Sequence, residues 1–458
     1  MLFHSWHFVI FFVIVYLVYL PLRKTRFYLY WLLAASYLFY GWWNPLYLIL
    51  IVYSTAINYY AVVLMARTQK QKPWLIVSIV NSFGVLGFFK YGVFVTDNLN
   101  ALLSILKMPF TIATPGIFLP VGISFYTFHA MSYTIDFYRG NIPKEPSFIR
   151  FATFIALFPQ LVAGPIVRAG DMLPQLTGKP EIRKENITDG LSLFFVGLFK
   201  KVALADYLAL YVDKVYAAPA LFDGLSLVLA TFAFGWQIYF DFSGYTDMAR
   251  GIARLMGFNL KLNFNNPYLA TSLGDFWNRW HISLSSWFKD YLYIPLGGNR
   301  KGQFNTYKNM FLTMVISGLW HGAAWTFVIW GALHALGRFL TRELERTTFY
   351  NEKVPMVVKQ VSVFAFVTFA WIFFRAESFS DATLIVNRIF SAGLANPNFP
   401  LVALFFCLSI WIYQFLFEAR INGRLNWMPI RVGVMCFILL YLMIFTTSGH
   451  EAFIYFQF

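Results

Sequence analysis

Of the seven histidines in this chain, His321 is the one that lies near the middle of a long apolar run, from Met310 to Gly337. The run contains no Asp, Glu, Lys, Arg, Tyr or Cys, and at about 1.5 Å per residue it is long enough to cross a bilayer core of roughly 30 Å. An imidazole titrates near neutral pH, and it is costly to keep at that depth without a partner or water. We therefore expect His321 to lie about halfway across the membrane as a functional group. The alternative is a histidine that only hydrogen-bonds a neighbouring helix.

A second histidine, His281, lies in a polar and tryptophan-rich stretch that runs from Asp275 to Trp287. We expect the first residue of this stretch to cap a helix on which Trp277, His281 and Ser285 follow one another on one face. In the alternative interpretation, this is an interfacial helix that is anchored by its tryptophans, and His281 is solvated.

The sequence offers few other chemistries. It has no H-E-x-x-H, C-x-x-C or Walker motif, and we expect no metal site. His321 and His334 would lie about 220° apart around a single helix, so they would not share a face. The cysteines Cys407 and Cys436 fall in apolar segments and are interpreted as core residues. The glycine-rich turn Pro295–Gly302 could hold a phosphate or be an ordinary turn.

The composition determines the class of protein that must position these groups. Of the 458 residues, 59% are hydrophobic and only 12% are charged, whereas soluble domains average about a quarter charged residues. We predict an all-α polytopic membrane protein with about ten to twelve spans, including short or re-entrant pieces. No separate soluble domain, internal repeat or low-complexity segment is evident, so residues 1–458 are interpreted as one transmembrane domain.

The basic residues cluster between the apolar runs, which explains the net charge of +15 without a nucleic-acid partner. Basic groups at 23–26, 67–72 and 139–150 place the N-terminus outside the cell, and the N-terminal segment lacks signal-peptide features. For the segments after residue 150, the basic residues do not decide on which side of the membrane each segment lies. The stretches 251–309 and 338–359 are both basic although one apparent span separates them, so one intervening piece could be re-entrant.

Three polar islands interrupt apolar runs, at 120–129, 158–166 and 241–247. Broken backbone at membrane depth is tolerated where it is buried in protein or lines a cavity, so the islands predict a polar tunnel. The alternative is helix packing at small residues. We interpret about 250–309 as amphipathic or re-entrant helices at the cytoplasmic mouth of this tunnel, within a motif-rich core at about 117–337.

These motifs resemble the membrane-bound O-acyltransferase (MBOAT) superfamily, specifically its bacterial AlgI-like branch, which contains the alginate O-acetylation proteins. The matching stretches are Pro120–Ser124, Tyr133–Arg139, Phe158–Ile166, Phe240–Met248, Asn263–Tyr268, Phe276–Ser285, Tyr291–Arg300, Ser317–Trp325 and the closing Phe453–Phe456. Asn278 stands where relatives often carry arginine.

The resemblance implies the MBOAT fold around a central tunnel, in a bacterial cytoplasmic (inner) membrane. It implies transfer of an acyl group, usually acetyl, from a cytoplasmic thioester to a hydroxyl of an extracytoplasmic polysaccharide. The donor would be acetyl-CoA or an acyl-carrier thioester, with no permanently bound cofactor. An SGNH-type acetyltransferase would be the partner that passes the group on.

The resemblance also implies roles for individual residues. His321 would be the catalytic base that takes a proton from the acceptor hydroxyl, and His281 would be the second catalytic histidine. His281, with Asn278 or the hydroxyls of Ser283 and Ser285, would orient the donor or stabilise the oxyanion. The remaining expected substrate-binding residues are Arg279, Trp280, Arg300, Lys301 and Trp320, of which the cations, together with Lys289, would attract the phosphates of the donor.

Two other functions compete with this one. A DltB-like subunit would transfer D-alanine from a carrier protein to teichoic acid through the same pair of histidines. A transporter would use the polar islands as a permeation route, and it predicts corresponding broken helices in two repeated halves, which the sequence does not contain.

Overall fold

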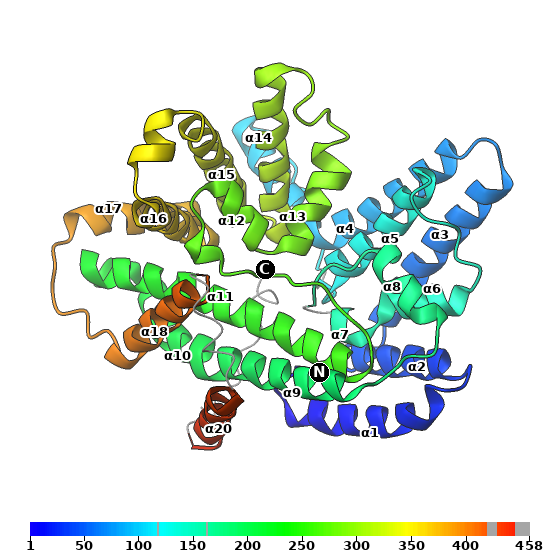
Figure 1. The fold of residues 1–458 in the computed structure, drawn as a ribbon. Coiled ribbons are helices and arrows are strands. Elements are labelled where there is room, and N and C mark those ends of the chain that lie inside the picture. The colour runs from blue at the N-terminus through cyan, green and yellow to red at the C-terminus, as the bar shows by residue number, and fades with distance from the viewer. Residues whose placement is uncertain (117–118, 162–163, 419–427, 445–458) are drawn as a thin grey trace. The chain divides into compact units, whose positions relative to one another are not determined.

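The computed structural model describes residues 1–116, 119–161, 164–418 and 428–444, and these form helices without any strand (Figure 1). Four of these helices are long and apolar enough to cross a membrane: α3 (Tyr47–Arg67), α4 (Lys72–Ile105), α11 (Gly224–Leu255) and α16 (Met356–Arg375). The predicted all-α membrane architecture is confirmed, and the number of about ten to twelve spans stays a prediction. The closing Phe453–Phe456 motif lies outside the described residues.

The chain divides into two compact units, which are described separately. Unit 1 comprises residues 1–191 and 249–261, and unit 2 comprises residues 192–248 and 262–458. The expectation of a single domain over 1–458 stays a prediction.

Unit 1 contains α3 and α4 together with several shorter helices. These are α1 (Trp6–Leu22), α2 (Tyr28–Gly41), α5 (Ile123–Tyr138), α6 (Phe148–Ala156), α7 (Phe158–Leu161), α8 (Ala169–Thr177) and the first turns of α9 (Lys184–Phe199). Buried Asn58 joins three of them, because its amide oxygen accepts hydrogen bonds from Ser78 at 2.7 Å and Thr134 at 3.0 Å. Such fully satisfied polar groups hold apolar helices together.

Two of the three polar islands interrupt their helices as expected. Gly122, with φ 77°, precedes the start of α5, and the island at 158–166 follows the end of α6 at Ala156. The third expectation is wrong, because residues 241–247 lie inside the uninterrupted helix α11.

The polar residues of α11 are satisfied by ion pairs instead. Lys201, in the π-helical turn η1 (Lys200–Ala205), lies 2.9 Å from a carboxylate oxygen of Asp241 and 2.7 Å from one of Asp206. Its neighbour Lys200 pairs with Asp247 at 2.7 Å. Because these ion pairs neutralise the carboxylates of Asp241 and Asp247, α11 can contain both residues and still continue as an unbroken helix.

Unit 2 contains the helices from η1 to η2, most of α11 and all the helices that follow α11. Those not named elsewhere are α10 (Asp206–Tyr216), η2 (Pro219–Leu221), η3 (Pro267–Leu269), η5 (Phe349–Lys353), α17 (Phe379–Ser391), α18 (Leu401–Glu418) and α20 (Met428–Ile444).

The apolar run 310–337 is a helical hairpin, so the expectation of a single span with His321 at its midpoint is wrong. Helix α14 (Gly302–His321) ends at the histidine, and α15 (Trp325–Leu344) runs back beside it (Figure 1). Two glycines let the backbones approach, because a Cβ on Gly318 would collide with the carbonyl of Phe327, and one on Gly331 with that of Met314. Hydropathy alone does not reveal such a reversal.

The hairpin changes where His321 and the basic flanks lie relative to the neighbouring helix α16. The His321 ring lies 5.4 Å from that of Phe374, in the last turn of the candidate span α16, so the histidine lies near one end of that helix. At the other end of the hairpin, Gln303 bonds Glu343 at 3.3 Å. The basic stretches that flank the run therefore meet at the same end of the hairpin, and the side of the membrane on which they lie stays a prediction.

The stretch around His281 is also broken. Two expectations about it are wrong, and so is the alternative interpretation of a solvated histidine on an interfacial helix. Helix α12 (Leu273–Arg279) is capped by the Ser272 hydroxyl rather than by Asp275. His281 has φ 44° and precedes a separate helix, α13 (Ile282–Phe288), so Trp277, His281 and Ser285 do not share one helical face. His281 is fully buried rather than solvated, and the tryptophans of this stretch, Trp277, Trp280 and Trp287, are buried in unit 2 rather than exposed as an aromatic belt.

Candidate active site

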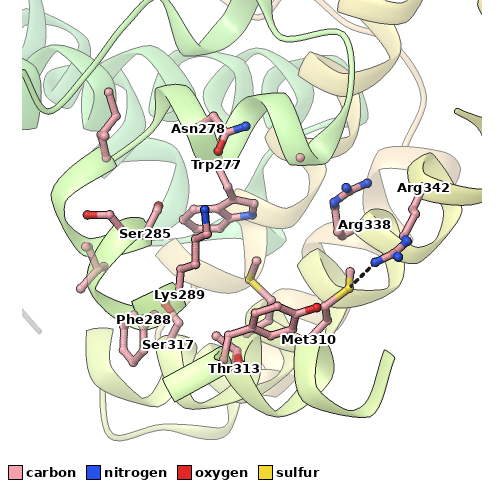
Figure 2. Close-up of a pocket in the computed structure, with 16 residues that line it drawn as sticks. Trp277, Asn278, Ser285, Phe288, Lys289, Met310, Thr313, Ser317, Arg338 and Arg342 are labelled. Carbon is pink, nitrogen blue, oxygen red and sulfur yellow. Dashed lines mark hydrogen bonds between the residues drawn. The ribbon is translucent and has the colours of Figure 1, made fainter. Parts of the chain in front are cut away.

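A cavity of about 400 Å³ opens in unit 2 between α12, α13, η4 (Lys289–Tyr293) and the α14–α15 hairpin (Figure 2). Its apolar walls include Trp277, Phe288 and Met310. Its uncharged polar lining residues are Asn278, Ser285, Ser286, Tyr293, Thr313 and Ser317.

Three cations line this cavity, and no acidic side chain is among its lining residues. Lys289 extends from η4, and Arg338 and Arg342 extend from α15 (Figure 2). Arg338 also lies 3.1 Å from Glu345, and it packs so closely on Gly274 that a Cβ there would lie 2.8 Å from the guanidinium carbon. We call this the basic cavity, because its charges suit an anion such as a phosphate.

The expected histidines lie close together, and neither lines the basic cavity. His281 and His321 both pack against Trp320, with ring centroids 6.1 Å and 4.9 Å from that of the tryptophan. Trp330 packs against His321 at 5.2 Å. The cavity comes near this pair through Ser317, which precedes His321 by one helical turn on α14.

His281 is enclosed by aromatic rings and tied to an amide. The ring of Phe242 meets it edge-on at 4.6 Å, and its Nδ1 lies 3.2 Å from Oδ1 of Asn263. Burial lowers the pKa of His281 to about 3, because the charged imidazolium would lose its hydration. The imidazole is therefore neutral at physiological pH.

The other expected residues fall into three places. Asn278 and Ser285 line the basic cavity, whereas Ser283 bonds Asn263 beside His281. Trp280 is buried, with its ring 5.2 Å from that of Trp371.

The expected donor-binding cations are not all in the cavity. Arg279 pairs with Asp275 at 2.8 Å and also with Glu418, so its charge is locally balanced. Arg300 and Lys301 are exposed at the start of α14. About 20 residues of helix separate them from His321, or roughly 30 Å.

His334 lies on a different helix from His321, so the argument about their angle around one helix does not apply. It is fully buried, with its ring 4.6 Å from Trp330 and 5.1 Å from Trp277. Within the described part of the chain, no group of three or more His, Cys, Asp or Glu residues could hold a metal ion.

Sequence reasoning missed three residues of this region: Arg338, Arg342 and Asn263. The two arginines are four positions apart, just after an apolar run, and that spacing on one helical face was the available signal. Asn263 lies inside a motif that carries the family resemblance, but nothing in its spacing connects it to His281, 18 positions away.

Comparison with known proteins agrees with this architecture. Residues 27–379 match the model of the MBOAT, membrane-bound O-acyltransferase family. The chain is 42% identical over 366 residues to the "Probable alginate O-acetylase AlgI" of Pseudomonas putida, which covers 79% of this chain and 74% of the relative. It is 34% identical over 492 residues to the peptidoglycan O-acetyltransferase of Helicobacter pylori, covering 93% and 91%.

A more distant match is the teichoic acid D-alanyltransferase of Streptococcus thermophilus, at 30% identity over 47% of this chain and 55% of the relative. The family model covers well over half of the chain, and the two closer relatives align over most of both sequences. The predicted family and enzyme class are confirmed: this chain is a multi-pass membrane O-acyltransferase that belongs to the membrane-bound O-acyltransferase family.

Proposed function

We propose that this enzyme moves an acetyl group from a cytoplasmic thioester donor across the cytoplasmic membrane, for O-acetylation of an extracytoplasmic polysaccharide. The observation that carries the proposal is the basic cavity, which ends one helical turn from His321 and its neighbour His281. In this proposal the N-terminus is extracytoplasmic, and an SGNH-type partner outside the membrane receives the acyl group.

The charges of the basic cavity support a phosphate-bearing donor, either acetyl-CoA or an acyl carrier with a phosphorylated arm. Lys289, Arg338 and Arg342 would hold the phosphate, because cations in a partly closed cavity are screened less than those on an open surface. Asn278 and Ser285 would hydrogen-bond the polar arm, and Ser317 marks where the thioester would come near His321. Arg300 and Lys301, further out, would steer the anion toward the cavity.

In the chemical step, the oxygen of the acceptor hydroxyl attacks the thioester carbonyl carbon while His321 takes the hydroxyl proton. The carbon–sulfur bond then breaks, and the protonated imidazole returns the proton to the leaving thiolate. General-base catalysis of this kind contributes on the order of 10²–10⁴-fold. The aromatic rings around His321 exclude water, which would otherwise compete as the acceptor.

The relatives support a polysaccharide acceptor. The names of the alginate and peptidoglycan relatives both specify O-acetylation, and their alignments cover 79% and 93% of this chain. The D-alanyltransferase alignment covers 47%, so D-alanyl transfer is the weaker candidate.

The direct test is polymer O-acetylation in cells that carry His321→Ala, with the abundance of the membrane protein measured in parallel. We expect ester content to fall at least about 100-fold while abundance is maintained, because the base is lost. Wild-type acetylation in this variant would rule out the proposed role of His321. Loss of the protein itself would instead assign the histidine to helix packing.

A further inference from the structure

Asn263 occupies a buried position next to His281 that the proposed mechanism does not use. It lies between α11 and η3 and is fully buried. Its side-chain oxygen accepts from the backbone N–H of Ser283 at 3.1 Å and from the Ser283 hydroxyl at 2.9 Å. The same oxygen lies 3.2 Å from Nδ1 of His281.

These contacts fix the protonation pattern of the imidazole. A backbone N–H can only donate, so the atom of Asn263 that faces Ser283 is the carbonyl oxygen rather than the amide nitrogen. That oxygen can only accept, so Nδ1 of His281 must carry its proton. In a neutral imidazole the other nitrogen, Nε2, then has a lone pair and no proton.

The backbone holds the two residues in this arrangement. The carbonyl oxygen of Asn263 accepts from the N–H of Ile282 at 2.9 Å, and Asn265 donates to the carbonyl of Arg279 at 2.9 Å. These bonds fasten the Asn263 segment to both sides of the break between α12 and α13. His281 itself has φ 44°, a costly conformation for a residue with a side chain.

This arrangement leaves Nε2 of His281 as the imidazole atom that can accept a hydrogen bond. This nitrogen is buried and has no hydrogen-bond partner among the described residues. The rings packed on His281 are those of Phe242, Phe264 and Trp320, and none of them is charged. Next to these rings in the chain, Asp241 precedes Phe242 and is paired with Lys201, and His321 follows Trp320.

We infer that Asn263 is a positioning residue that holds His281 as the Nδ1–H tautomer, so that Nε2 accepts a hydrogen bond from an O–H or N–H group of a substrate. The inference rests on the proposed acyl transfer and deepens it. Of the two roles open to His281, orienting a substrate fits this tautomer. Donating a hydrogen bond to an oxyanion does not, because Nε2 has no proton to donate.

The test is Asn263→Asp, which keeps the shape of the side chain and adds a negative charge beside Nδ1. A carboxylate stabilises the imidazolium and raises the pKa of His281. Protonation removes the Nε2 lone pair, so transfer should fall as pH decreases through the raised pKa. With membranes containing the full-length chain and labelled acetyl-CoA, we expect the rate at pH 6 relative to pH 8 to drop about threefold or more against wild type.

The matched control is Asn309→Asp, the same change at a buried asparagine whose side-chain amide donates to the carbonyl of Gly298. Its pH profile should keep the wild-type shape. A second measurement needs no activity: exchange of the His281 C2 proton, followed by mass spectrometry against pH, reports the pKa of that imidazole. Its midpoint should rise by about three units in Asn263→Asp only, from about 3 to above 6, because a smaller rise would leave the imidazole neutral at pH 6.

The kinetic constants show which substrate donates the hydrogen bond to Nε2 of His281. A raised KM for acetyl-CoA in Asn263→Asp assigns the hydrogen bond to the donor arm, and a lowered kcat with unchanged KM assigns it to the acceptor hydroxyl. If neither the pH profile nor the exchange midpoint differs from those of Asn309→Asp, the inference is wrong. An active His321→Ala enzyme would reject the proposed function separately, without changing the exchange result.

Discussion

Arg338 and Arg342, together with Lys289, line a cavity, whereas Arg300 and Lys301 are exposed at the surface. A charge–charge interaction at an exposed position is weakened by water and salt, and it contributes little to binding. Inside a partly closed cavity the same charge interacts more strongly with an anion, and guanidinium groups can bind a phosphate through two parallel hydrogen bonds. We therefore expect the cavity arginines to dominate donor affinity over Arg300 and Lys301.

Replacement of both cavity arginines, Arg338→Gln with Arg342→Gln, tests this expectation. The KM for acetyl-CoA should rise roughly tenfold, and its dependence on salt should weaken, because the charges that bind the phosphate are gone. The measurement is initial-rate acetyl transfer at several ionic strengths.

The comparison variant is Arg300→Gln with Lys301→Gln, in which donor use should weaken by a smaller factor, about two- to threefold, because steering affects mainly the association rate. Arg183→Gln with Lys184→Gln, two exposed changes in unit 1, controls for net charge. Equal effects of the two double variants would show that the cavity does not bind the donor phosphate.

Individual residues could be predicted from sequence where they contrast with their surroundings. A histidine inside an apolar run is conspicuous in any hydropathy profile, and His321 was identified as a candidate for this reason. His281 was identified from its tryptophan-rich stretch and from the family resemblance. Asn263 was not, because an asparagine in a polar stretch looks ordinary until the fold brings it to 3.2 Å from His281. The relation between the two residues is tertiary, and no periodicity encodes it.

At the scale of elements, the sequence predicted which segments form apolar helices but not where a helix reverses or continues unbroken. The α14–α15 hairpin looks like one span because Gly322, Ala323 and Ala324 in its turn are as compatible with an apolar helix as the residues around them. The reversal is stabilised by Gly318 and Gly331, whose missing side chains let the two backbones touch. In α11 the opposite error occurs, because polar residues that suggest a break are paired with lysines of η1.

Gly318→Ala tests the hairpin directly. The added methyl group would collide with the carbonyl of Phe327, so the helices must separate and move His321 relative to Trp330. We expect a loss of about 1–3 kcal/mol in stability, as in other overpacked contacts, with acetyl transfer reduced as well. Thermal unfolding in detergent, followed by tryptophan fluorescence, measures the first effect.

The matched control is Gly87→Ala in α4 of unit 1, where a Cβ would have nothing within 4 Å. This change should leave stability unchanged or raise it by about 0.5–1 kcal/mol, because alanine loses less backbone entropy than glycine in a helix. A Gly318→Ala protein as stable as Gly87→Ala would mean that the helices tolerate separation and that the close contact does not hold the turn.

At the scale of the whole molecule, the two ends of the α14–α16 bundle in unit 2 differ in charge. The end that contains the start of α14, the end of α15 and the start of α16 has an excess of basic residues: Arg300, Lys301, Lys308, Arg338, Arg342, Arg346, Lys353 and Lys359 against Glu343, Glu345 and Glu352. The opposite end, beside His321, has Arg375 and Arg388 together with Glu377 and Asp381. The positive-inside rule therefore predicts that the first end is cytoplasmic.

Single cysteines at the two ends of α16 test this orientation in a Cys436→Ser background, since the remaining Cys407 is buried. A membrane-impermeant maleimide should label Glu377→Cys in intact cells, and Lys353→Cys only after permeabilisation, because both positions are exposed but on opposite sides. Such labelling would place the mouth of the basic cavity at the cytoplasm and His321 toward the outside. The acyl group would then be passed along the hairpin from its basic end to its turn. Labelling of both positions from the same side would mean that α16 does not cross the membrane, and the proposed direction of transfer through unit 2 would be wrong.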